Sequence, residues 1–132
     1  MAASNSFFSG ITDMLILYFL EQKDCYGYEM TKVVSELSEG RLSISINTIY
    51  TAIYKLENEG MISEYSKKVG KKRIRVYYHL EPDGHVHLER LLSAYQLMVA
   101  GVDKIMEKPI MEECWDDART EPRFDRPVLE RG

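Results

Sequence analysis

The sequence has little of what metalloproteins, redox enzymes and membrane proteins require. Its two cysteines, Cys25 and Cys114, lie far apart and outside any metal-binding or redox spacing. We therefore expect no disulfide framework, metal site or cofactor, and we predict a reducing, cytoplasmic location. The longest apolar run, Met14 to Leu20, is far shorter than the roughly 20 residues that cross a bilayer, and no cleavable signal precedes it. The sequence predicts a soluble protein with no membrane partner.

Catalytic motifs are missing as well. We find no Gly-rich phosphate loop, nucleophile elbow or convergent carboxylate pair. His85 and His87 are the most suggestive chemical residues, but two positions along a helix they diverge by about 200° around its axis. Their rings then cannot share one metal ion. We predict that the protein is not an enzyme.

Positive charge is in the minority overall but concentrated in one segment. The chain carries 17 Lys or Arg against 21 Asp or Glu, whereas residues 41–80 carry 8 against 3. Six cations without an intervening acid occupy its densest part: Lys67, Lys68, Lys71, Lys72, Arg73 and Arg75. Such a cluster, in a chain of net charge −4, is typical of a surface that binds a polyanion. A solvated hairpin tip would have the same composition, so the neighbouring elements must decide.

Apolar residues recur at helical spacing in three segments before this cluster. They predict helices over residues 7–22 and 28–37, and a third that begins after a cap at Ser45 or Asn47 and ends at Gly60. The first helix is apolar on most sides. We therefore expect its own domain, and a second subunit, to cover it.

The third helix has one apolar face and one polar face. Its apolar face consists of Ile49, Ala52, Ile53 and Leu56. On the opposite face, Thr48, Thr51 and Lys55 align at spacings of three and four. Hydroxyls and a cation near a helix N-terminus suit the major groove of DNA, because hydroxyls reach base edges or phosphates and the helix dipole favours anions. An ordinary amphipathic helix would look the same in isolation.

After Gly60 the apolar period changes to two. The pattern predicts strands over residues 61–67 and 73–80, joined by a turn at Gly70, and the cation cluster falls on this hairpin. Three helices followed by a basic hairpin predict a winged helix-turn-helix within a mainly α (α+β) fold. In that geometry the third helix enters the major groove while the hairpin neutralises flanking phosphates.

A longer helix is predicted from Pro82 to about Lys108, ended by Pro109. Its apolar residues alternate at spacings of three and four, the seam of a coiled-coil-like pair: Leu88, Leu91, Tyr95, Met98, Val102 and Ile105. The helix is too long for three short helices to cover, so we predict that it forms a homodimer. Packing against the first helix of the same chain, or of the partner, is the alternative.

These elements predict three parts. Residues 1–81 form a winged-helix DNA-binding domain and residues 82–109 a dimerisation helix. Residues 110–132 are charged and proline-bearing without sustained periodicity, and we expect a poorly ordered tail.

Five motifs follow one another over roughly residues 8–108: Tyr26-Gly27-Tyr28-Glu29, Asn47-Thr48-Ile49-Tyr50, Leu56-Glu57-Asn58-Glu59-Gly60-Met61-Ile62, Arg73 to Leu80 with its paired tyrosines, and Gly84. In this order they resemble the PadR-like winged-helix transcriptional regulators, in particular the short subfamily with a single C-terminal dimerisation helix. The resemblance implies a homodimeric repressor that binds an inverted repeat in double-stranded DNA. It also implies ten DNA contacts: Tyr28, Asn47, Thr48, Tyr50, Thr51, Lys55, Lys71, Lys72, Arg73 and Arg75.

Some of these regulators release DNA when an aromatic or cationic compound binds. Tyr95 stands where several relatives carry a tryptophan that stacks on planar ligands, and tyrosine offers a smaller face. Glu81 stands where Thr commonly precedes the last helix, so capping there is expected from Asp83. A ligand- or metal-sensing winged helix, or a protein-interaction module without operator binding, are the alternative functions.

Overall fold

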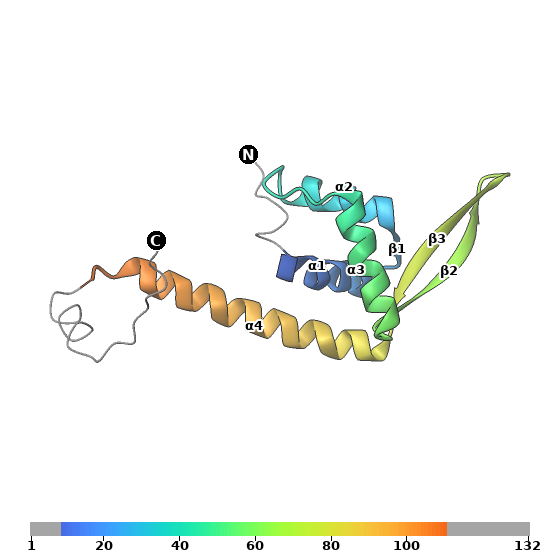
Figure 1. The fold of residues 1–132 in the computed structure, drawn as a ribbon. Coiled ribbons are helices and arrows are strands. Elements are labelled where there is room, and N and C mark those ends of the chain that lie inside the picture. The colour runs from blue at the N-terminus through green and yellow to red at the C-terminus, as the bar shows by residue number, and fades with distance from the viewer. Residues whose placement is uncertain (1–8, 111–132) are drawn as a thin grey trace, which may run out of the picture. The chain divides into compact units, whose positions relative to one another are not determined.

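A computed structural model describes residues 9–110 of the chain, so Phe7, Cys114 and the predicted tail beyond Ile110 lie outside the described residues. In chain order the elements are α1 (Ser9–Gln22), β1 (Cys25–Tyr26), α2 (Gly27–Leu37), α3 (Ile46–Asn58), β2 (Ile62–Val69), β3 (Arg73–Leu80) and α4 (Pro82–Glu107) (Figure 1). The predicted helices and hairpin are confirmed within this range. The chain forms two compact units, which divide after Tyr95, within α4.

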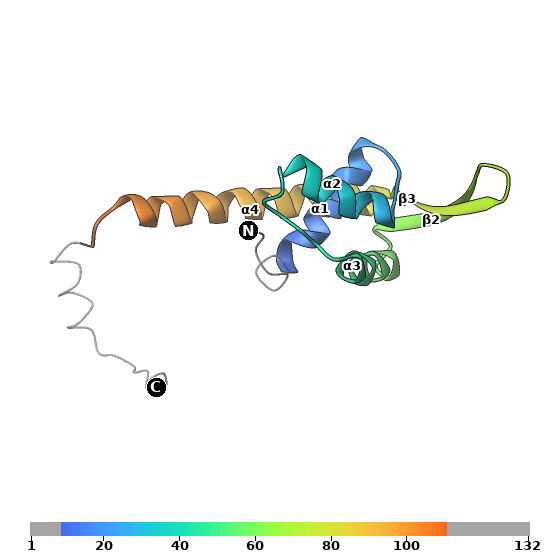
Figure 2. The same ribbon diagram turned by 90° about the horizontal axis from the view of Figure 1, so that it is seen from above.

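The first unit has one hydrophobic core, built around α1. Met14, Ile16, Leu17, Phe19 and Leu20 of this helix are all buried. Residues of α2, α3, β2, β3 and the start of α4 complete the cluster: Met30, Val34, Ile49, Ile53, Leu56, Ile62, Tyr78 and Leu88. The prediction that α1 is covered on most sides by its own domain is confirmed. Seen from above, α3 lies to one side of α1 and α2 (Figure 2).

The sheet has three antiparallel strands in the order β1-β3-β2. The hairpin register runs from Ile62 opposite Leu80 to Val69 opposite Arg73. Strand β3 was predicted correctly. The apolar side chains on one face of this strand are buried only near the base of the hairpin, since Tyr78 is 3% exposed and Ile74 is 71% exposed. The hairpin extends beyond the helices, so its outer half has no core to face (Figure 1).

Strand β1 was missed by the sequence reading. It is only two residues long and pairs Cys25 with Tyr78 and Tyr26 with Tyr77. Two residues carry no period from which a strand can be recognised.

Both α2 and α3 end in the same backbone motif. At the end of α3 the amide of Gly60 donates to the Glu57 carbonyl at 3.0 Å and the amide of Met61 donates to the Leu56 carbonyl at 2.9 Å, with Gly60 at φ +77°. This is a Schellman motif, which requires a left-handed residue just past the helix. The predicted stop at Gly60 is therefore confirmed.

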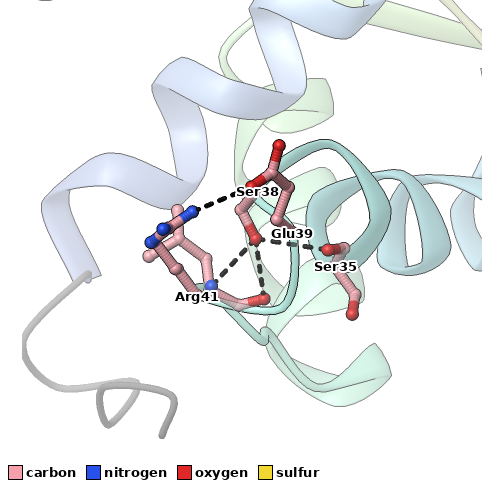
Figure 3. A network of polar contacts seen from close by, with 5 residues as sticks. Ser35, Ser38, Glu39 and Arg41 are labelled. Atoms are coloured by element: carbon pink, nitrogen blue, oxygen red, sulfur yellow. Dashed lines mark hydrogen bonds and ion pairs between the residues drawn. The ribbon is translucent and has the colours of Figure 1, made fainter.

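The equivalent left-handed position after α2 is Glu39, at φ +56°. The amide of Gly40 donates to the Ser35 carbonyl at 2.8 Å, and the Ser38 hydroxyl accepts from the Leu42 amide at 2.9 Å. Figure 3 shows the hydrogen bonds of the Ser38 hydroxyl, together with the ion pair of Arg41 and Glu39 at 3.2 Å. A side chain with a Cβ is strained in this conformation, so α2 ends less favourably than α3.

We expect Glu39→Gly to raise the free energy of unfolding by about 0.5 to 1 kcal/mol, because glycine adopts the left-handed conformation without strain. The ion pair that is lost has two well-exposed partners, so it offsets little of this gain. Chemical denaturation measures the change. The matched control, Gly60→Ala, should lower stability by a similar amount; a Glu39→Gly variant less stable than wild type would show that the ion pair dominates.

Helix α4 begins against the core. The Glu81 carbonyl accepts from the His85 amide at 3.1 Å, and the Glu81 carboxylate accepts from the Ser63 hydroxyl at 2.5 Å. A Cβ at Gly84 would lie 2.2 Å from the Met61 carbonyl oxygen, so the helix approaches the chain after α3 more closely than any side chain permits. Among residues 9–110, no helix combines the length and the apolar character needed to cross a bilayer.

Candidate nucleic-acid interface

Helix α3 presents a polar stripe to solvent because its opposite face is buried. Ser45 caps the helix: its hydroxyl accepts from the Thr48 amide at 3.2 Å, which decides between the two predicted caps. The four predicted apolar residues are all buried. Directly opposite them lies the recognition stripe, a run of exposed residues spaced by four, three and four: Asn47, Thr51, Tyr54 and Asn58.

Two members of the recognition stripe, Tyr54 and Asn58, were missed by the sequence reading. Tyr54 is 56% exposed. The sequence did contain this signal. At 3.6 residues per turn, both positions lie on the side of the helix opposite the four apolar residues. The prediction instead chose residues by their hydroxyl or lysine side chains. It therefore selected Thr48 and Lys55, which lie on one flank of α3.

Thr48 and Lys55 lie on the flank that faces α1. The Lys55 ammonium forms an ion pair with the Asp13 carboxylate. Thr48 is half-buried, and its hydroxyl accepts from the Ser45 hydroxyl at 2.9 Å. A hollow of about 300 Å³ lies between the two helices and is lined by Thr12, Asp13, Asn47, Thr48, Thr51, Ala52 and Lys55.

Tyr50 lies on the other flank and supports Tyr54. Its ring is half-buried against the start of α2, where a Cβ at Gly27 would lie 2.6 Å from the Tyr50 Cζ. The Tyr50 and Tyr54 rings stack, with centroids 6.0 Å apart and planes 28° apart. Gly27 therefore provides the space that holds this pair, and Tyr28, beside it, is exposed.

The hairpin divides its cations between the tip and the sheet face. Lys71, Lys72 and Arg73 are exposed around the predicted turn at Gly70, which has φ +75°. Arg75 is half-buried instead, and its guanidinium lies 4.1 Å from the centroid of the Tyr26 ring. A cation held over an aromatic ring gives up part of its freedom to reach a phosphate.

Three tyrosines form a connected set on the same sheet face. The Tyr77 ring meets Tyr26 edge-on at 5.6 Å and stacks on Tyr65 at 5.8 Å, and the Lys67 ammonium lies 5.3 Å from the Tyr77 centroid. Such contacts stiffen the root of the hairpin.

Asp24 ties the hairpin to the end of α1. The Tyr65 hydroxyl donates to its carboxylate at 2.7 Å, and His79 Nδ1 lies 3.0 Å from the other oxygen. Burial alone would raise the pKa of Asp24, but the hydrogen bonds from Tyr65 and His79 outweigh it and lower that pKa. The carboxylate therefore stays ionised and links β1, β2 and β3.

Two carboxylates face each other where α3 meets β2. Burial, and then the hydrogen bond and charge of Glu64, raise the pKa of Glu57 to about 6. This value lies above the ordinary 4.5, so protonation favours the folded state. The stabilisation is fully present below about pH 4.5 and is lost as pH rises through 6.

We expect Glu57→Gln to remove this pH dependence and to raise stability at pH 7.5 by less than about 1 kcal/mol, since both groups are partly solvated. The neutral amide relieves the repulsion and still donates to Glu64. Denaturation at pH 5.0 and 7.5 measures the effect. Glu64→Gln should have the same effect. If stability changed with pH in both variants as it does in wild type, the two carboxylates would not share a proton.

The predicted dimerisation residues fall into two groups. Leu88 is fully buried and Leu91 half-buried in the core of the chain's own first unit, which agrees with the alternative of intrachain packing for these two. The other four predicted residues are exposed: Tyr95, Met98, Val102 and Ile105. The spacing alone could not separate a core residue from an interface residue.

Residues 9–110 hold no group of three or more His, Cys, Asp or Glu side chains placed to bind a metal ion. His85 faces Glu21 at 3.3 Å. Burial raises the pKa of the Cys25 thiol to about 11, so this cysteine stays protonated at neutral pH. A protonated thiol is a poor nucleophile, because the thiolate is the reactive form.

A helical core, a capped third helix with an outward polar stripe and a basic hairpin together define a winged-helix DNA-binding protein. The sequence pattern of the family described as "Transcriptional regulator PadR-like family" matches residues 16–90. The chain belongs to this family, as the motifs indicated, and the family is one of transcriptional regulators rather than enzymes.

Solved structures agree with this assignment. A transcriptional regulator from Clostridium thermocellum is 28% identical, with a TM-score of 0.70 over 77% of this chain and 96% of that one. A PadR family transcriptional regulator from Eggerthella lenta is 25% identical, with a TM-score of 0.68 over 79% and 88%. A relative from Lysinibacillus sphaericus, named only as an uncharacterized protein, is 29% identical over 74% of this chain and 90% of its own.

Proposed function

We propose that the protein is a homodimeric repressor that binds an inverted repeat in duplex DNA. The observation that carries the proposal is the recognition stripe on α3 together with an exposed cationic hairpin tip, in a chain whose net charge is −4. Residues 41–80 carry 8 Lys or Arg against 3 Asp or Glu, and such a local excess of positive charge in a chain of negative net charge suits a polyanion.

The proposed contacts separate into two kinds. The recognition stripe reads base edges in the major groove, where the Asn47 amide can pair with adenine and the Tyr54 ring can contact thymine methyl groups. Lys71, Lys72 and Arg73 neutralise phosphates beside the groove, and Tyr28 meets the backbone from the start of α2. Thr48, Tyr50 and Arg75 are then placed to support these contacts, since each is already engaged by a neighbour. Lys55, which is paired with Asp13, lies on the flank of α3 next to the recognition stripe.

Dimerisation is proposed through the exposed apolar residues of α4. The helix has 26 residues and is about 39 Å long at 1.5 Å per residue. Apolar residues at spacings of three and four favour association with an identical helix. A twofold dimer places two α3 helices in successive major grooves, so its site is an inverted repeat.

Tyr95 is the proposed contact for a flat aromatic or cationic effector. It is 38% exposed and lies among the proposed dimerisation residues. A tyrosine face stacks on planar cations with less area than tryptophan would offer. Equal binding of a planar aromatic cation by wild type and by Tyr95→Ala would remove this part of the proposal.

Selection of bound duplexes from a random library tests the proposed function. We expect enriched sites made of two half-sites related by a twofold axis and separated by about one helical turn, roughly 10 base pairs. The same material should sediment as a dimer. Failure to enrich any sequence, or enrichment of single half-sites by a monomer, would contradict the proposal.

A further inference from the structure

The hollow between α1 and α3 contains a carboxylate where a DNA-binding surface would be expected to have none. α1 and α3 pack against each other, and Asp13 of α1 lines the hollow together with Asn47 and Thr51 of the recognition stripe. A carboxylate beside DNA repels phosphate. Its place next to the recognition stripe needs a physical reason.

The ion pair with Lys55 contributes too little to folding stability to explain the position of Asp13. The Lys55 side chain is 53% exposed, and surface ion pairs contribute about 0 to 1 kcal/mol. The partners differ in freedom, however, because the Asp13 side chain is only 15% exposed. The covered carboxylate is the fixed member, and it determines where the flexible lysine holds its ammonium group.

The pair also changes what the lysine can bind. An ammonium group has three donors, so one carboxylate leaves donors available for a further acceptor. Beside Asp13 the net charge of the pair is close to zero, so a phosphate gains little from Lys55 and is repelled by Asp13. The acceptor atoms of a base edge, such as O6 and N7 of guanine, carry partial charges and incur a smaller penalty.

We propose that Asp13 is a positioning residue for sequence recognition, which holds Lys55 toward the base edges and prevents it from acting as a phosphate contact. This rests on the proposed DNA binding by α3. It assigns a role in specificity to a residue of α1 and turns Lys55 from a source of general affinity into one of discrimination.

Two binding measurements on four proteins test the proposal. Fluorescence anisotropy gives the affinity of wild type, Asp13→Asn, Lys55→Ala and the double variant for a selected duplex and for a scrambled duplex, each over a range of KCl concentrations. In Asp13→Asn the released lysine contributes one more phosphate contact in each subunit, so the slope of log K against log salt should steepen by about 0.9 for each half-site, or about 1.8 for the dimer. The ratio of selected to scrambled affinity should fall by roughly tenfold, the effect of one weakened base contact.

Glu21→Gln is the matched control. It removes one negative charge from the same helix, but Glu21 faces His85 of α4 instead of α3. Its salt slope and specificity ratio should equal those of wild type. Asp13→Ala, which also removes the hydrogen-bond acceptor, should repeat the effect of Asp13→Asn, and thermal unfolding checks that each variant is folded.

Three results would overturn the proposal. Wild-type slope and specificity in both Asp13 variants would show that the carboxylate does not position Lys55. An effect of Asp13→Asn that persists in the Lys55→Ala background would show that Asp13 acts by itself. A wild-type protein that binds no duplex at low salt would remove the proposed function and this inference together, whereas the first two results leave the proposed function intact.

Discussion

Replacing Lys71, Lys72 and Arg73 with alanine is expected to weaken binding to every duplex near 0.1 M salt by roughly two to three orders of magnitude for each half-site. These cations are exposed around the hairpin turn. Each phosphate contact releases condensed counterions, so three lost contacts per subunit lower the salt slope by about 2.7 for each half-site. Anisotropy titrations over a KCl series measure both quantities.

The ranking of sequences should not change in this triple variant, because phosphates carry no sequence information. Asn47→Ala or Tyr54→Ala should do the opposite, with a loss of about 1 to 3 kcal/mol of discrimination per base contact and a nearly unchanged salt slope. A control triple, Lys32→Ala, Arg90→Ala and Lys104→Ala, removes the same charge from α2 and α4. If the hairpin and control triples weaken binding equally, net charge explains the effect and the hairpin does not bind the backbone.

Gly84→Ala is expected to lower the free energy of unfolding by about 2 to 3 kcal/mol. The added Cβ would lie 2.2 Å from the Met61 carbonyl oxygen and 2.7 Å from Leu80 Cδ1. A backbone oxygen cannot move aside as a flexible side chain can, so either α4 or the segment after α3 must shift. Urea denaturation at a fixed protein concentration measures the loss, since dimerisation would make apparent stability depend on concentration.

Gly101→Ala is the matched control in the same helix. A Cβ at Gly101 would have no neighbouring atom within 4 Å, so the substitution should stabilise by up to about 1 kcal/mol through helix propensity. Opposite signs in the two variants are the expected outcome. A Gly84→Ala variant as stable as wild type would show that α4 is not locked against Met61.

Much of the fold could be predicted because it depends on local chemistry. Ser45 before α3 and Gly60 after it are residues that cap and end helices, and both do so here. The buried face of α3 followed from its spacing. The hairpin followed from a change of period together with Gly70.

What could not be predicted depends on contacts between distant segments. Asp13 and Lys55 are brought together only when α1 packs on α3, and Arg75 meets Tyr26 only through the two-residue strand β1. Leu88 has the spacing of the predicted dimer seam, yet it is buried in the core of its own domain. Periodicity identifies an apolar face but not the surface that covers it.

The most direct test of the account is the affinity of the purified protein for its selected duplex as a function of KCl concentration. Three phosphate contacts in each of two subunits predict a linear plot of log K against log salt with a slope of about −5. A flat plot, or no affinity for any duplex at low ionic strength, would contradict the claim that α3 and the cationic hairpin bind DNA.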